Sequence, residues 1–99
     1  MDPQVRTDKA EIAAFCRRWN VIELAFFGSV VRDDFSADSD IDVLVAFAPD
    51  ARPGFLTLSR MERELAEMLG RRVEVTTKGG LKPLIRESVL AQAEILYAA

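Results

Sequence analysis

Two short groups of residues in this sequence have the types and spacing for chemistry on phosphate esters. Gly28-Ser29 follows an apolar run, and ten residues later Asp40 and Asp42 open a second apolar run. A glycine lets the backbone approach a ligand closely, and backbone amides at the start of a helix attract anions. Paired carboxylates offer magnesium its preferred hard oxygen ligands. Together the two groups predict a site for a phosphate-bearing ligand and a divalent cation.

Alternation along a strand places Asp40 and Asp42 on the same face, opposite the apolar side chains between them. Two carboxylates about 5 Å apart repel by roughly 3 kcal/mol at an effective dielectric constant near 20. A magnesium ion, or manganese in its place, offsets this repulsion and normally binds substrate phosphates as well. Ser29 and Arg32 can add a hydrogen bond and a charge-assisted contact to such a phosphate.

A third carboxylate, Glu74, lies in the alternating run 73–77. If this run forms a strand beside the run 41–47, Glu74 shares the face of the two aspartates. It can then bind the metal or accept a proton from an attacking hydroxyl group.

Each signal has a simpler interpretation when taken alone. A Gly-Ser pair is usually an ordinary turn, and an Asp-x-Asp pair is more often a solvated strand end. A glutamate between valines more often faces solvent on an edge strand. The occurrence of the first two signals between two predicted strands favours a functional site.

Composition narrows the chemistry. The 99 residues contain no histidine and one cysteine, which excludes Ser-His-Asp and Cys-His catalysis and zinc sites built on these ligands. A net charge of −3 disfavours direct nucleic-acid binding, which depends on Lys and Arg contacts to phosphates. The single Cys16 cannot form an internal disulfide, which favours a cytoplasmic location. No membrane span or secretory signal is expected.

Periodicity predicts one small domain of α+β (α/β-like) class, with helices against a small mixed sheet. Asp8 and Glu11 have the spacing of a capping box before the first helix, and Gly70 ends the middle helix. The predicted order is helix 9–18, strand 21–27, a short helix 29–32, strand 41–47, helix 55–69, strand 73–77 and a last helix from near Pro83 through Leu96. Aromatic residues Trp19, Phe26 and Phe27, together with Cys16, are predicted core positions, whereas Arg71, Arg72 and Lys78 are predicted to be solvated.

The pattern Gly28-Ser29, ten residues, Asp40-Ile41-Asp42 resembles the signature of the DNA polymerase beta-like nucleotidyltransferase superfamily. The chain length, the position of Arg32 and the ending 81–97 resemble the minimal nucleotidyltransferases of bacteria and archaea. This resemblance extends over nearly the whole chain. It implies the palm fold of that superfamily in a single minimal nucleotidyltransferase domain, residues 1–99.

The resemblance also implies a function and roles for individual residues. The chain would transfer a nucleoside monophosphate, AMP from ATP, to a hydroxyl group. The residues that would bind the nucleotide are Gly28, Ser29 and Arg32; those that would bind magnesium and catalyse are Asp40, Asp42 and Glu74. Minimal members commonly act as antitoxins that adenylylate a tyrosine of a HEPN-domain toxin, so such a toxin is the implied partner in a hetero-oligomer.

The sequence departs from the family pattern at three positions. Glu74 stands where aspartate is usual, and its extra methylene moves the carboxylate by about 1 Å, a displacement that can cost about a hundredfold in rate. Val31 stands where a small residue is frequent, and Asp33 where glycine is frequent. These departures leave open a second function, an antitoxin that has lost activity and neutralises its partner by binding.

A third function, transfer to a small molecule or an RNA end, ranks last. Larger relatives hold such acceptors with additional domains, for which 99 residues have no room unless a partner or a second copy supplies the surface. The sequence predicts neither the acceptor nor the oligomeric state, and no segment of it predicts a pocket for the nucleotide base.

Overall fold

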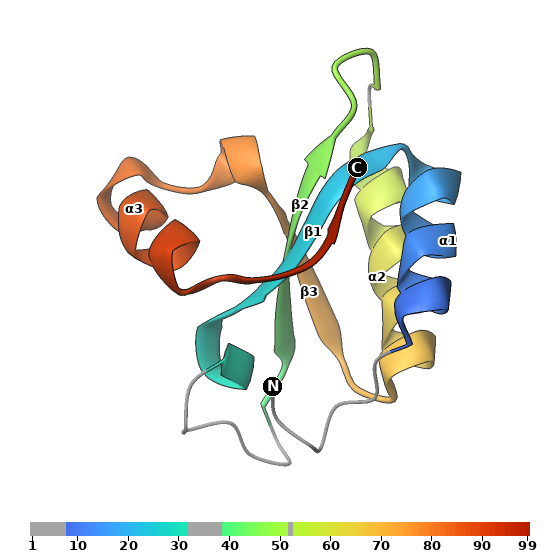
Figure 1. The fold of residues 1–99 in the computed structure, drawn as a ribbon, viewed down its shortest axis with the longest axis horizontal. Helices are drawn as coiled ribbons and strands as arrows, with labels where there is room; N and C mark the ends of the chain where they lie inside the picture. The colour runs from blue at the N-terminus through green and yellow to red at the C-terminus, as the bar shows by residue number, and fades with distance from the viewer. Residues whose placement is uncertain (1–7, 32–38, 52) are drawn as a thin grey trace.

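A four-stranded sheet in the order β3-β2-β1-β4 forms the centre of the molecule (Figure 1). The structure is a computed structural model that describes residues 8–31, 39–51 and 53–99. The elements in chain order are α1 (Lys9–Trp19), β1 (Val21–Phe27), the 3-10 turn η1 (Gly28–Val31), β2 (Ile41–Phe47), α2 (Phe55–Leu69), β3 (Val73–Thr77), the 3-10 turn η2 (Lys78–Gly80), α3 (Pro83–Gln92) and β4 (Glu94–Ala98).

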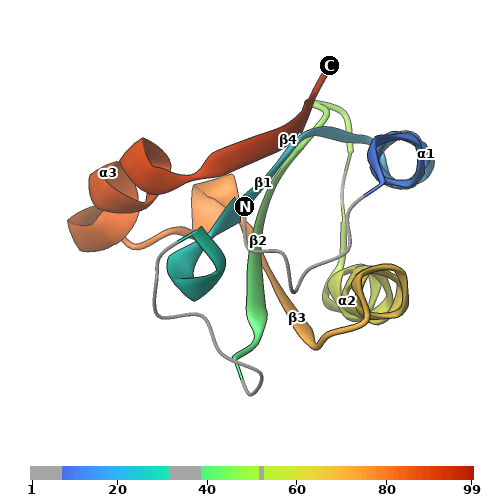
Figure 2. The ribbon, with the colours of Figure 1, turned by 60° about the horizontal axis from the view of Figure 1, so that its bottom comes forward.

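The sheet is mixed, which confirms the predicted α+β class. Strand β1 pairs antiparallel with both β2 and β4, whereas β3 pairs parallel with β2. Helices α1 and α2 lie side by side on one face of the sheet, and α3 lies on the opposite face (Figure 2). The chain therefore has a two-helix face that closes the main core and a second face with much less cover.

Local signals set the start of α1 and the end of α2 where the sequence predicted them, and the end of α1 within one residue. The Asp8 carboxylate accepts hydrogen bonds from the backbone N–H groups of Ala10 and Glu11 at 2.9 and 3.2 Å and so begins α1. Asn20, with φ 60°, ends α1 one residue later than predicted, and Gly70, with φ 72°, ends α2. Both residues adopt the left-handed conformation that commonly terminates helices.

The end of the chain corrects one prediction. The last helix was expected to continue through Leu96, but α3 ends at Gln92 and residues 94–98 form strand β4. Ala and Leu at helical spacing favour a continued helix locally. The backbone of β1 would otherwise carry an unpaired edge, and pairing with β4 satisfies its hydrogen-bonding groups.

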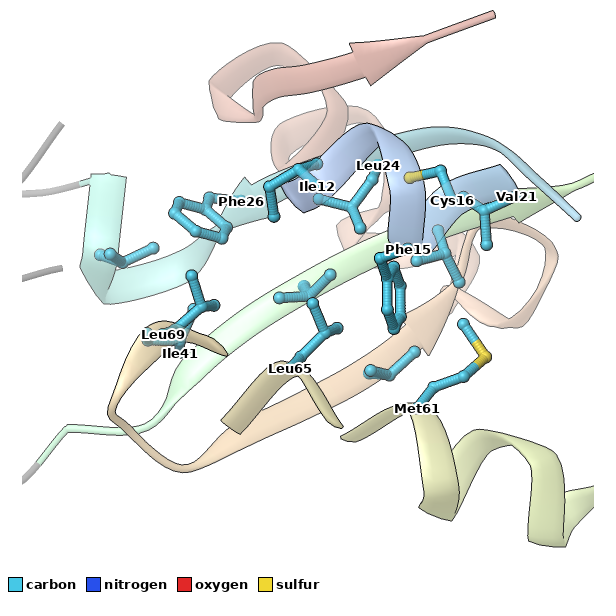
Figure 3. Close-up of a cluster of buried hydrophobic side chains, with 14 residues drawn as sticks. Ile12, Phe15, Cys16, Val21, Leu24, Phe26, Ile41, Met61, Leu65 and Leu69 are labelled. Carbon is cyan, nitrogen blue, oxygen red and sulfur yellow. The ribbon is translucent and has the colours of Figure 1, made fainter. Parts of the chain in front are cut away.

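Most buried side chains gather between the sheet and the two-helix face (Figure 3). They come from both helices and from the inward positions of the strands: Ile12, Phe15, Cys16, Leu24, Phe26, Ile41, Val43, Val45, Met61, Leu65 and Leu69 are among the fourteen. Phe26 and Cys16 are core residues, as predicted, and Trp19 packs partly buried against them. Burial raises the pKa of the Cys16 thiol to about 12, with the nearby Arg17 charge acting in the opposite direction.

A smaller cluster lies on the other face of the sheet. Ala25, Leu44 and Leu81 are buried there, and side chains of Phe27 and α3 pack against them. Phe27 is thus only partly buried, and it belongs to this second cluster rather than to the main core. The two clusters follow from strand alternation, since Leu24 and Phe26 face one side of β1 and Ala25 and Phe27 the other.

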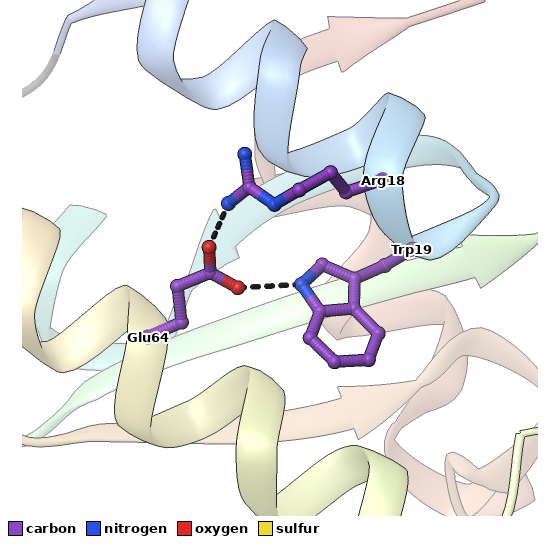
Figure 4. Close-up of polar contacts among 3 residues, drawn as sticks. All are labelled: Arg18, Trp19 and Glu64. Atoms are coloured by element: carbon purple, nitrogen blue, oxygen red, sulfur yellow. Dashed lines mark hydrogen bonds and ion pairs between the residues drawn. The ribbon is translucent and has the colours of Figure 1, made fainter.

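One polar group ties α1 to α2 (Figure 4). The Glu64 carboxylate of α2 accepts a hydrogen bond from Trp19 Nε1 at 2.6 Å and forms an ion pair with Arg18. Both partners come from the last turn of α1. This contact fixes how the two helices pack and lies on the opposite side of the sheet from the predicted site.

Candidate nucleotide site

The Gly28-Ser29 turn and Asp42 are brought together by the pairing of β1 with β2. Phe27, the last residue of β1, is the register partner of Asp42. Gly28 then turns the chain into η1 with φ 75°, and a Cβ atom at this position would lie 2.3 Å from Asp42 Oδ2. Only glycine permits this conformation and this approach together. The two predicted halves of the site are therefore adjacent, and Ser29 is half-buried beside them.

Glu74 lies on the strand next to Asp42. The two residues are register partners in the parallel pair of β2 and β3, so both side chains leave the same face of the sheet. The predicted placement of Glu74 is therefore correct. The Glu62 carboxylate of α2 accepts a hydrogen bond from the Val75 backbone N–H at 2.7 Å. This bond satisfies an amide of the edge strand and ties β3 to α2.

Asp40 immediately precedes β2 and has a different partner. Its Oδ1 lies 3.2 Å from Nε of Arg72, an ion pair that is largely exposed to solvent. Arg71 Nη2 donates to the Ser39 carbonyl at 2.7 Å, so both arginines border this end of the sheet. An exposed ion pair contributes little stability and can be exchanged for another partner.

The carboxylates do not form a compact three-ligand cluster in this conformation. Across residues 8–31, 39–51 and 53–99, no group of three Asp, Glu or Cys side chains is close enough together to hold a metal ion. Asp42 and Glu74 are adjacent, with Asp40 turned to Arg72. Their carboxylate oxygens are nevertheless the ligand type that suits a hard divalent cation. Because Gly28 has no Cβ, the Asp42 carboxylate can occupy the space beside it.

An open cavity of about 560 Å³ extends from Asp42 and Gly28 toward α3. Its other lining residues are Phe27, Leu84, Ile85, Ser88, Val89 and Gln92. The sequence did not predict this wall. Leu84, Ser88 and Gln92 are four residues apart in the sequence and therefore share one face of α3. No local pattern, however, indicated that α3 would lie over the turn that follows β1.

The remaining predicted residues are placed away from the cavity or beyond the described ranges. Arg32 and Asp33 lie outside the described residues. Lys78, which the sequence predicts to be solvated, is half-buried and forms an ion pair with Glu23 at 2.9 Å. Glu23 lies four residues before Phe27 on β1, toward the other end of the sheet. No helix within the described ranges is long and apolar enough to cross a bilayer.

Comparison with known proteins identifies the fold and the family. The family model of the nucleotidyltransferase domain matches residues 11–96. The chain belongs to the nucleotidyltransferase domain family. The matched range includes Gly28, Asp42 and Glu74, and the predicted resemblance to nucleotidyltransferases is confirmed. The chain is therefore a nucleotidyltransferase of minimal size.

Relatives agree with this assignment. The chain is 39% identical over 80 residues to the protein adenylyltransferase MntA of Thermococcus cleftensis, covering 81% of this chain and 77% of that protein. It is 35% identical to the solved structure of a protein assigned as a minimal nucleotidyltransferase, with a TM-score of 0.71 over 86% of this chain and 85% of the other.

A more distant solved structure has the same fold. It contains tri-AMPylated Shewanella oneidensis HEPN toxin in complex with MNT antitoxin. The matched chain is 18% identical, with a TM-score of 0.67 over 92% of this chain and 70% of that chain.

Proposed function

We propose that this nucleotidyltransferase transfers AMP from ATP to a tyrosine hydroxyl of a HEPN-family toxin and thereby acts as its antitoxin. The observation that carries the proposal is the contact of Gly28 with Asp42, which puts a turn suited to phosphate against a carboxylate suited to a metal. The relative named as a protein adenylyltransferase and the fold shared with an antitoxin bound to an AMPylated toxin support the choice of donor and acceptor.

In the proposed site, Gly28 and Ser29 bind the triphosphate, with Arg32 as a further contact. Asp42, Glu74 and Asp40 would hold magnesium, and Asp40 would exchange its ion pair with Arg72 for the metal. When bound, magnesium neutralises negative charge on the phosphate oxygens as the transition state forms. The acceptor oxygen forms a bond to the α-phosphorus, the bond to pyrophosphate breaks, and Glu74 accepts the hydroxyl proton.

Label transfer from α-labelled ATP to the co-expressed toxin tests this proposal. We expect Asp42→Asn to reduce transfer at least a hundredfold with the fold intact, because it removes a carboxylate charge beside Gly28. Asp50→Asn is the matched control, since Asp50 is an exposed aspartate in the turn after β2. Absence of transfer by the wild-type chain, or equal transfer by the two variants, would refute the proposal.

Neutralisation by binding alone is the second candidate function. Two observations favour it: Glu74 occupies the position of an aspartate, and Asp40 is engaged by Arg72. In this case the double variant Asp40→Asn with Asp42→Asn still binds and neutralises the toxin. Loss of neutralisation by a folded double variant would exclude binding as the sole mechanism.

A further inference from the structure

Helix α3 turns one face toward the cavity that contains Asp42. Leu84, Ser88 and Gln92 are spaced four residues apart, so they form a single stripe along the helix. All three line the cavity of about 560 Å³ that begins at Gly28 and Asp42. Cavities of this size are typical of sites for small molecules and cofactors.

This stripe combines apolar and polar side chains beside a half-open site. No residue of α3 is buried, and Leu84 and Ile85 are 98% and 48% exposed. Phe27 contributes an aromatic ring to the lining of the same cavity. Ser88 and Gln92 are exposed on α3 and bring a hydroxyl and an amide to the cavity. Apolar and aromatic side chains with a few polar groups are the typical lining of a site for a small organic molecule.

We propose that the α3 face binds the nucleobase of the donor nucleotide and favours adenine. The inference rests on the proposed function, in which Gly28 and Asp42 hold the triphosphate. With the phosphates there, the nucleoside must extend into the rest of the cavity, whose other lining residues are Phe27 and members of α3. In this arrangement Phe27 and Leu84 contact the faces of the base, and the Gln92 amide forms hydrogen bonds with its edge.

The chemistry of Gln92 accounts for the preference for adenine. A glutamine amide carries one acceptor and two donors, and it can pair simultaneously with the N6 amino group and the N7 acceptor of adenine. Guanine presents two acceptors on the corresponding edge, so the amide oxygen has no donor to pair with there. Ser88, one helical turn before Gln92, can donate or accept and adds a second polar contact.

Equilibrium binding of MgATP and MgGTP to the full chain tests this inference. We expect the wild type to bind ATP about tenfold more tightly than GTP, and Gln92→Leu to remove this difference. Leu84→Ala weakens binding of both nucleotides about threefold or more because it removes apolar contact with the base. Leu56→Ala is the matched control, since Leu56 is 72% exposed on α2 and does not line the cavity.

The outcomes separate this inference from the proposed function. Nucleotide affinities unchanged by Gln92→Leu and Leu84→Ala would overturn the inference even if the chain transfers AMP. If the same variants instead lose binding to the toxin, the face docks the acceptor protein, and the inference is again wrong. A base preference that depends on Gln92 in a chain without transfer activity would support the inference and refute the proposed function. No measurable ATP binding by the wild type would refute both. Both substituted side chains are exposed, and thermal melts verify that the variants fold.

Discussion

Replacing Gly28 by alanine tests the geometry on which the site depends. The new methyl group meets two obstacles: Gly28 has φ 75°, and its Cβ would lie 2.3 Å from Asp42 Oδ2. The first obstacle is the cost of holding an L-residue in the left-handed conformation, about 1–2 kcal/mol of unfolding free energy, called the backbone term below. For a domain of this size, each kcal/mol lowers the melting temperature by about 4–8 °C. The second obstacle acts on function, because the Asp42 carboxylate must move by about 1 Å to reach an ordinary contact distance.

Gly70→Ala separates the two effects. Gly70 has nearly the same φ, 72°, but a Cβ at this position meets no atom within 4 Å. Both variants therefore lose the backbone term, whereas only Gly28→Ala displaces Asp42. The Asp42 carboxylate is the end of a flexible side chain, so we expect the two losses of unfolding free energy to agree within about 1 kcal/mol. We expect AMP transfer to fall about a hundredfold in Gly28→Ala alone, since misplacing a reacting group by about 1 Å has this cost.

Urea denaturation and label transfer, measured on both variants, give the answer. Denaturation midpoints report the shared backbone term, and initial rates of transfer report the position of Asp42. If Gly28→Ala transfers AMP within twofold of Gly70→Ala, the carboxylate position does not limit catalysis and the reasoning is refuted. A much larger stability loss in Gly28→Ala would show that Asp42 cannot yield, which also contradicts the argument.

Three further predictions concern single side chains. Glu74→Gln leaves the melting temperature nearly unchanged because Glu74 is exposed, but it slows AMP transfer about a hundredfold in single-turnover assays; an unchanged rate would remove Glu74 from the mechanism. Glu64→Ala loses about 1–2 kcal/mol of unfolding free energy because the hydrogen bond from Trp19 and the ion pair with Arg18 are both lost. Glu64→Gln keeps an acceptor for Trp19 and loses less, and equal losses in the two variants would contradict this division. Cys16 has a pKa raised from 9.0 to about 12 by burial, so its thiol stays protonated in the folded chain and reacts with a disulfide reagent at pH 8 only at the rate of unfolding. The thiol of the unfolded chain ionises at a lower pH than that of the folded chain. The stability that the buried Cys16 thiol contributes is therefore complete below about pH 9 and is lost as the pH rises toward 12. Rapid labelling of Cys16 in the native protein would show that the thiol is not buried.

Local patterns determined much of this protein. The strands 21–27, 41–47 and 73–77 have the predicted bounds, because apolar or alternating runs between turn residues indicate strands directly. Asp8 and Gly70 mark the helix ends through capping, which involves residues only a few positions away. The chemistry of the site was equally local, since residue types and spacing alone indicated a phosphate turn and a carboxylate pair.

Tertiary structure decided what depends on pairing between distant segments. Strand β4 forms where a helical turn was predicted, because it pairs with the otherwise open edge of β1. Local helix and strand propensities contain no information about such an edge. The register of β1 with β2 put Gly28 against Asp42, and the parallel pairing of β3 with β2 put Glu74 beside it. The engagement of Asp40 by Arg72 and the cavity wall formed by α3 likewise arise from segments remote in sequence. The sequence therefore determined which groups can do chemistry, and packing of the sheet decided which of them meet.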